Sequence, residues 1–192
     1  IAEDPLSNLA AVFQIEHDLA MQVGHLIIVG GTLDGPGDVT AAAEFNMYCA
    51  ADAARLVFNS PATMTLLPLD VTTQASLTFD FLNRLPKEST GAGRLLHAIL
   101  PGAFQAYRQQ LGLEGIYVPE AIAVTAALHP ELLVTERFPC DVETGGSITH
   151  GAPVIDRRSH TVDRPNIDVA VDIDAAGAVD CILRCMEGGK NA

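Results

Sequence analysis

The stretch "HLIIVGGTLDGPGDVTAAAEFN", residues 25–46, indicates the fold class. Its first half contains the short apolar run Leu26–Val29, which ends at two glycines and predicts a buried strand. Its second half places Asp38, Glu44 and Asn46 within nine positions of one another. In α/β proteins, ligands bind beyond the carboxyl ends of the strands. A buried strand that leads into a polar, glycine-rich loop therefore makes this loop a candidate binding site.

The rest of the chain alternates between helical and strand patterns. Apolar residues at helical spacing predict a first helix over residues 5–18. A second buried strand is expected over residues 62–72, with Asp70 and Thr72 at its far end. The other expected helices cover 50–59, 78–85, 91–111 and 176–187, and the other expected strands lie within 133–143, 147–158 and 166–174. This order predicts one α/β domain over residues 1–192, with an open, mainly parallel sheet flanked by helices.

Composition and charge narrow the range of functions. Of the 192 residues, 48% are hydrophobic, which is enough for one domain with a buried core. A net charge of −13 with only 11 Lys and Arg residues argues against a nucleic-acid partner, which requires clustered positive charge. No apolar run approaches the roughly 18 residues of a membrane span. Four cysteines without zinc-site spacing indicate buried thiols in a reducing compartment, so we expect a cytoplasmic protein.

The polar residues after the first strand allow two interpretations. Asp38, Glu44 and Asn46 offer acceptors and an amide donor, which suit a polyhydroxylated neutral ligand such as a sugar. The alternative is a solvated loop with a helix cap, and polarity alone favours it. The order of the residues, rather than their polarity, shifts the balance toward a binding site.

That order resembles the inosine-uridine-preferring nucleoside hydrolases, which carry a Pro-Gly-Asn-x-Thr-x-x-x-Glu-Phe-Asn segment. Collinear similarity extends to "PLSNLA" at 5–10, "LPLDVTTQ" at 67–74 and "DVETGGSITHGAPVIDRR" at 141–158. The resemblance implies a Rossmann-like α/β fold and a role in purine and pyrimidine salvage. The implied reaction is hydrolysis of the N-glycosidic bond of a ribonucleoside to free base and ribose. The implied cofactor is one calcium ion, held by oxygen ligands.

The resemblance also implies roles for individual residues. Glu44 and Asn46 match the ribose-binding Glu and Asn of the family. Asp38 stands where the family usually has Asn, and when ionised it accepts hydrogen bonds but donates none. Ser7 matches a Thr that binds calcium through its backbone carbonyl.

A second departure from the family lies at the helix that is expected to begin at Pro119. Pro119 matches a family His, and proline cannot act as a general acid toward the leaving base. Glu120 matches the calcium-binding Asp on a longer side chain. The alternative for Glu120 is a carboxylate that only interacts with the helix dipole.

The family's Asp-x-Asp-x-x-x-Asp-Asp motif, which provides most calcium carboxylates, has no match in residues 1–192. We therefore expect this chain to be the C-terminal portion of a nucleoside hydrolase. The chain alone should have little or no activity, and the complete protein should form a homo-oligomer. The rival hypothesis is a non-catalytic descendant that binds a ribosyl compound or a partner protein. The histidines, including His150 and His160, are expected to be structural or solvated.

Overall fold

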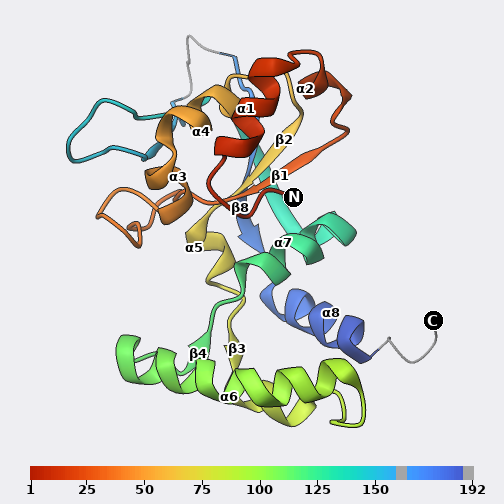
Figure 1. Cartoon of the computed structure of the whole chain (residues 1–192). Coiled ribbons are helices and arrows are strands. Elements are labelled where there is room, and N and C mark those ends of the chain that lie inside the picture. Colours follow the sequence, from red (N-terminus) through yellow and green to blue (C-terminus); the bar gives the residue numbers. More distant parts are fainter. Residues whose placement is uncertain (159–163, 188–192) are drawn as a thin grey trace. The chain divides into compact units, whose positions relative to one another are not determined.

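The computed structural model describes residues 1–158 and 164–187, and it divides into two compact units (Figure 1). Unit 1 comprises Ile1–Val71 and Leu133–Asp172, and unit 2 comprises Thr72–Leu132 and Ile173–Ala192. Helices and strands alternate along most of the chain, as the sequence predicts.

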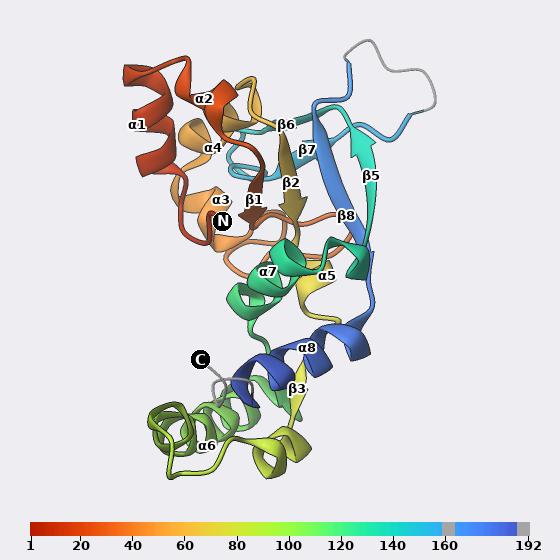
Figure 2. The same cartoon turned by 90° about the vertical axis from the view of Figure 1, so that its right-hand side faces the viewer.

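Unit 1 is built on a four-stranded sheet with the order β1-β2-β8-β5. Strands β1 (Leu26–Val29) and β2 (Met64–Leu67) pair in parallel, with Leu26 opposite Met64. Strand β8 (Ile167–Ile173) continues the parallel arrangement beside β2, whereas β5 (Leu133–Phe138) at the edge runs the opposite way in Figure 2. The expected open, mainly parallel sheet is thus confirmed.

Helices α1 (Ser7–Ile15) and α4 (Ala51–Phe58) pack side by side on one face of this sheet. Both were expected from their apolar spacing, and α1 is shorter than predicted at both ends. Removal of each large aliphatic or aromatic side chain from water contributes about 1.5–3 kcal/mol, so this layer supplies much of the driving force for folding. Its core includes Leu6, Ala10, Phe13, Ala54, Val57 and Phe58 from the helices and Ile28, Leu66, Ile167 and Val169 from the sheet.

The segment expected as one long strand over residues 62–72 is instead a strand followed by a short helix. Strand β2 ends at Leu67, and α5 spans Leu69–Thr72. Pro68 between them has no N–H to donate to a sheet ladder, which ends the strand. The prediction that Asp70 and Thr72 lie on a strand is therefore wrong, since both lie on α5.

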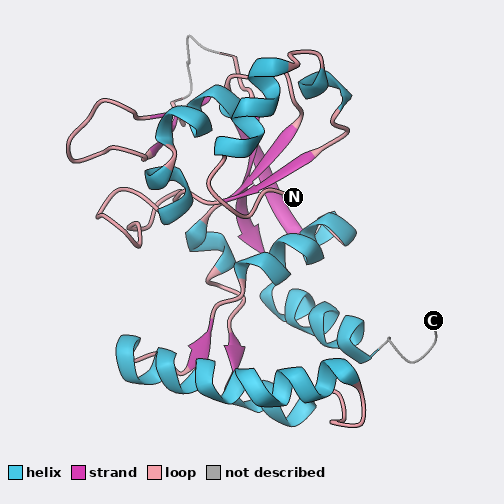
Figure 3. Cartoon of the chain, in the orientation of Figure 1, coloured by secondary structure: helices cyan, strands magenta, loops and turns pink. Residues whose placement is uncertain are grey.

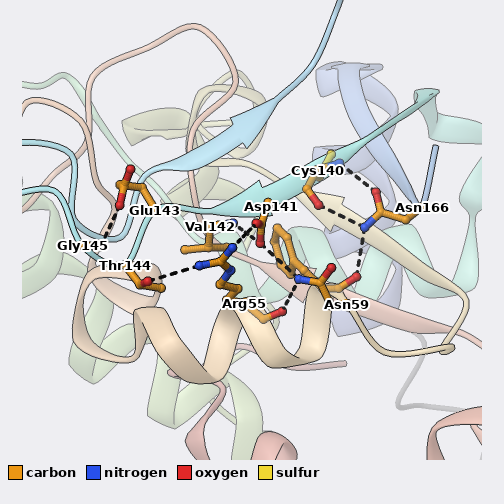
Figure 4. Close-up of polar contacts among 10 residues, drawn as sticks. Arg55, Asn59, Cys140, Asp141, Val142, Glu143, Thr144, Gly145 and Asn166 are labelled. Atoms are coloured by element: carbon orange, nitrogen blue, oxygen red, sulfur yellow. Dashed lines mark hydrogen bonds and ion pairs between the residues drawn. The ribbon is translucent and has the colours of Figure 1, made fainter. Parts of the chain in front are cut away.

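A small antiparallel sheet of β6 (Cys140–Val142) and β7 (Pro153–Ile155) completes unit 1. Asn166, just before β8, fixes this sheet through three hydrogen bonds (Figure 4). Its Nδ2 donates to the carbonyls of Phe58 and Cys140, both at 3.0 Å. Its Oδ1 accepts from Cys140 N–H at 2.7 Å. Arg55 pairs with Asp141 at 2.9 Å in the same cluster. The end of α4 is thereby tied to both sheets.

The two remaining helices of unit 1 are α2 (Leu19–Gln22) and α3 (Phe45–Cys49).

Unit 2 is mostly helical (Figure 3). Helix α6 (Gly91–Leu111) has the predicted bounds, because Thr90 caps its start and Gly112, in the left-handed region, ends it. The unit also contains β3 (Leu77–Thr78) paired with β4 (Gly115–Ile116), the 3-10 helices η1 (Phe79–Arg84) and η2 (Pro130–Leu132), and the helices α7 (Pro119–Leu128) and α8 (Ala175–Glu187). Within residues 1–158 and 164–187, none of the helices has the length and apolar character needed to cross a membrane.

Candidate functional site

The loop that leaves β1 begins at two glycines whose backbone conformations exclude other residues. Gly30 has a φ of 146° and Gly31 a φ of 71°, both in the region that L side chains rarely adopt. A β-carbon on Gly30 would lie 2.8 Å from Oε2 of Glu44, and one on Gly31 would lie 2.5 Å from Cγ of Pro153. The chain can therefore turn this tightly, and approach both neighbours, only with glycine at both positions.

Glu44 connects this loop to helix α3. As the N-cap of α3, it accepts hydrogen bonds from the N–H groups of Asn46 at 2.9 Å and Met47 at 3.3 Å. Its Oε2 also accepts from Gly31 N–H at 2.9 Å. Only 7% of the residue is exposed, and this burial raises the pKa of the carboxyl above its usual range despite the three N–H donors. The capping role in the alternative interpretation is thus present, but this carboxylate is buried rather than solvated.

Asp38 and Asn46 lie at the same helix start. Oδ1 of Asp38 accepts from Phe45 N–H at 2.8 Å, so Asp38 and Glu44 together hold the first three N–H groups of α3. Asn46 is 9% exposed and donates to the carbonyl oxygens of Glu3 at 3.0 Å and Val29 at 3.2 Å. The structure therefore brings together the three residues that the sequence proposed for ribose binding. Their position, at the carboxyl end of β1, is also the expected one.

The two proposed calcium ligands lie in different units. Ser7 is the first residue of α1 in unit 1 and is exposed. Glu120 is exposed in the first turn of α7 in unit 2, directly after Pro119 at the first helical position. This position also suits a carboxylate that interacts only with the helix dipole.

The described residues do not fit a calcium site by themselves. Calcium takes six to eight oxygen ligands in its usual sites. In the part of the chain that the structure describes, no group of three or more His, Cys, Asp or Glu side chains is arranged to hold a metal ion. The carboxylates of Asp38 and Glu44 are already engaged by backbone N–H groups.

Four histidines have the contacts expected of structural residues. His25 bonds Thr65 at 2.9 Å, and His97 bonds the Pro86 carbonyl at 3.2 Å. His129 contacts Glu131 at 3.0 Å, and His150 bonds the Thr144 carbonyl at 3.1 Å. His160 lies outside the described residues.

Two cavities of unit 1 involve other residues. The larger, of about 680 Å³, lies beside the Asn166 cluster, and the smaller, of about 410 Å³, lies between α1, α2 and the end of α4. Neither is lined by Asp38, Glu44 or Asn46. The larger is lined by polar residues that include Asn59, Asp141, Asp156, Arg158, Arg164 and Asn166.

Sequence reasoning missed the residues that anchor the β1 loop, Asp70 and Arg157. Asp70 accepts hydrogen bonds from the loop backbone, and Arg157 pairs with Asp34 of the same loop. The sequence placed Asp70 at the far end of the second expected strand and gave no reason to assign it a role.

The sequence profile described as "Inosine-uridine preferring nucleoside hydrolase" matches residues 1–180. The chain belongs to this nucleoside hydrolase family. Among curated relatives, it is 33% identical over 177 residues to the non-specific ribonucleoside hydrolases RihC of Salmonella paratyphi B and Salmonella newport. Each match covers 92% of this chain and 56% of the relative. The chain thus spans little more than half the length of these nucleoside hydrolases.

Solved nucleoside hydrolases have the same fold. A plant nucleoside hydrolase, PpNRh1, superposes with a TM-score of 0.88 at 26% identity, over 95% of this chain and 59% of that one. A purine-preferring ribonucleoside hydrolase from Gardnerella vaginalis superposes with a TM-score of 0.87 at 28% identity, over 97% of this chain and 59% of that one. The α/β class and the family assignment drawn from the sequence are both confirmed.

Proposed function

We propose that this chain forms the ribose-binding part of a ribonucleoside hydrolase, which cleaves the N-glycosidic bond of a nucleoside to free base and ribose. The observation that carries the proposal is the convergence of Asp38, Glu44 and Asn46 on the start of α3. Membership of the nucleoside hydrolase family and the ribonucleoside hydrolase names of its relatives support the substrate class.

The remaining hydrogen-bonding capacity of these side chains suits sugar hydroxyls. Both amide hydrogens of Asn46 go to backbone carbonyls, which leaves its Oδ1 as an acceptor. Among the described residues, none donates to this Oδ1 or to Oδ2 of Asp38. A carboxylate has about four acceptor positions, and Glu44 uses three of its own for backbone N–H groups. The site therefore offers acceptors, and the hydroxyls of a ribose are the matching donors.

The two carboxylates also suit the electrostatics of the reaction. Hydrolysis breaks the bond from C1′ to the base nitrogen and forms a bond from C1′ to a water oxygen, with positive charge on the sugar in the transition state. Backbone N–H groups fix the carboxylates of Asp38 and Glu44 in advance. Fixed negative groups need little reorganisation as the charge develops, so they stabilise the transition state more than solvent does.

Activity of the 192-residue chain on its own is not expected. The resemblance implies calcium, and Ser7 and Glu120 offer far fewer oxygens than the six to eight that calcium takes. Pro119, at the first position of α7, provides no acidic proton for the leaving base. We expect the active species to contain further calcium ligands, to be cytoplasmic and to form a homo-oligomer.

A second candidate function is a non-catalytic ribosyl-binding or protein-interaction role. Asp38, Pro119 and Glu120 favour it, because each departs from the family pattern at a position tied to binding or catalysis. Neither form of this candidate includes hydrolysis, and only the ribosyl-binding form retains the sugar site.

Calorimetric titration of the 192-residue chain with D-ribose and with inosine tests the sugar site. We expect Asn46→Ala to weaken binding by about tenfold or more, whereas Asp52→Asn, on the exposed first turn of α4, should leave it unchanged. A thermal melt of each variant controls for folding. Failure of the folded wild-type chain to bind either ligand would contradict the proposal.

Base release separates the two candidates. Inosine and uridine are incubated with the chain, with calcium added or with a chelator. Release that the chelator abolishes would support a hydrolase and contradict the expected inactivity of the chain alone. No release by any longer form that carries the missing carboxylates would favour the non-catalytic role.

Loss of calcium affinity in Glu120→Gln would support metal binding by Glu120, and unchanged affinity would leave the helix-dipole role.

A further inference from the structure

Three consecutive backbone N–H groups of the β1 loop point at one carboxylate. Oδ1 of Asp70 accepts from Leu33 N–H at 2.8 Å, and Oδ2 accepts from Asp34 N–H at 2.7 Å and Gly35 N–H at 3.1 Å. Hydrogen bonds from N–H groups to an ionised carboxylate are among the stronger ones in proteins. Asp70 thus holds the middle of this loop, just as Glu44 holds its start through Gly31.

The backbone of the loop also follows the end of β2. Gly30 N–H donates to the Leu67 carbonyl at 3.1 Å, and Leu69 N–H donates to the Gly31 carbonyl at 2.9 Å. These bonds continue the parallel pairing of β1 with β2 past the end of both strands. They bring the loop to the first turn of α5, where Asp70 lies.

Arg157 holds the same segment through a different side chain. Its Nη2 donates to Asp34 Oδ1 at 2.5 Å and to the Leu33 carbonyl at 2.7 Å, and its Nη1 donates to Asp34 Oδ2 at 3.2 Å. This two-pronged contact is the geometry that distinguishes arginine from lysine. The hydrogen bond to Arg157 lowers the pKa of Asp34, so this carboxyl stays ionised well below neutral pH.

We propose that Asp70 and Arg157 are positioning residues for the ribose site, because together they fix Leu33–Gly35 and so set the path of the loop to Asp38. Only Pro36 and Gly37 separate Gly35 from Asp38, and the proline ring restricts φ in that short link. A displacement at Gly35 is therefore passed to Asp38 and to its bond with Phe45 N–H. The role rests on the proposed function, whereas the contacts themselves do not.

Amide hydrogen exchange on the 192-residue chain, followed by NMR, measures the anchoring directly. Asp70→Asn keeps the shape but replaces one acceptor oxygen with an NH₂ group, and Asp70→Ala removes all three acceptor contacts. We expect Asp70→Ala to speed exchange at Leu33, Asp34 and Gly35 by about tenfold or more, with a smaller increase in Asp70→Asn. Exchange at Phe45 should also rise, while exchange at Leu66 in the core stays unchanged.

Ribose affinity of the same variants tests the positioning role. Asp70→Ala should weaken D-ribose binding by about tenfold or more, and Asp52→Asn should have no effect. Arg157→Lys keeps the charge but loses the paired contact, so it should give a smaller loss of both protection and affinity. This variant serves as the test if Asp70→Ala does not fold.

The outcomes of these two experiments distinguish the anchoring, the positioning role and the proposed function. Unchanged exchange at Leu33–Gly35 in the Asp70 variants overturns the anchoring. Faster exchange with unchanged ribose affinity overturns the positioning role and leaves the proposed function intact. A folded wild-type chain that binds no ribose overturns the proposed function and the positioning role together, while the exchange result still decides the anchoring.

Discussion

The carboxylate of Glu44 lies against the backbone of Gly30, so close that a β-carbon there would come within 2.8 Å of Oε2. The same oxygen accepts the N–H of the next residue, Gly31. The strand end and the helix cap therefore form a single packed unit, in which the glycine leaves the space that the carboxylate occupies. The position of the Glu44 carboxylate therefore requires a glycine at position 30.

Gly30→Ala should destabilise the protein by about 2–4 kcal/mol, because it adds the strain of an unfavourable φ to a clash with Glu44. The variant should also weaken ribose binding. Gly24→Ala is the matched control, since a β-carbon at Gly24 meets no atom within 4 Å. Urea denaturation of both variants gives the comparison. Equal midpoints for Gly30→Ala and the wild type would show that Glu44 is not confined as described.

Glu44 should make stability fall as pH rises. Burial raises its folded-state pKa above the ordinary value of 4.5, so the folded chain binds this proton more tightly than the unfolded chain. The contribution is fully present below pH 4.5 and is lost as pH rises through the folded-state pKa. Glu44→Gln should remove this slope. Free energies of unfolding from urea melts at a series of pH values test it, and identical slopes in both proteins would contradict it.

Asn166→Ala should cost about 2–4 kcal/mol of stability, because it leaves the N–H and C=O of Cys140 and the C=O of Phe58 without a side-chain partner. Asn59→Ala is a suitable control, since Asn59 is exposed and its loss should cost less than about 1 kcal/mol. Thermal melts of the two variants measure the difference. Similar melting temperatures would mean that Asn166 does not join α4 to the two sheets.

The four cysteines should fall into two classes of reactivity. The expectation of buried thiols is wrong for Cys49 and Cys185, which are exposed, and is confirmed for Cys140 and Cys181, which are buried. Burial raises the pKa of Cys140 to about 12, so almost none of it is thiolate at mildly alkaline pH. A disulfide reagent should modify Cys49 and Cys185 in the folded chain, and Cys140 and Cys181 only after denaturation. Peptide mapping identifies the modified thiols, and rapid modification of Cys140 would contradict its burial.

The sequence predicted best those helices and strands whose ends are set by neighbouring residues in the sequence. Strand β1 matches the predicted run Leu26–Val29, because its apolar residues end at a pair of glycines. Helix α6 matches 91–111, because a capping Thr and a glycine bound it. The predicted strand is longer than β2, because the apolar pattern continues past Pro68 although the proline cannot donate to the sheet ladder.

The sequence predicted that Asp38, Glu44 and Asn46 form a group, but it did not predict the contacts that hold the loop around them; their role in ribose binding stays a prediction. The order of residues in the loop identified Asp38, Glu44 and Asn46 as a group, and the structure places them together. The anchoring by Asp70 and Arg157 depends on which strands become neighbours and on the turn of α5, and neither follows from local patterns. The role of Ser7 and Glu120 toward calcium stays a prediction.

The contact between Gly31 and Pro153 bears on how the protein is made. A β-carbon at Gly31 would clash with the ring of Pro153, so the turn packs closely against β7. The turn is translated long before β7. Contacts between such distant parts of a chain form late, because a large loop must close first. During synthesis, α1, β1 and β2 leave the ribosome before β7 has been translated. The packing of the turn against Pro153 is therefore completed only once β7 has been translated.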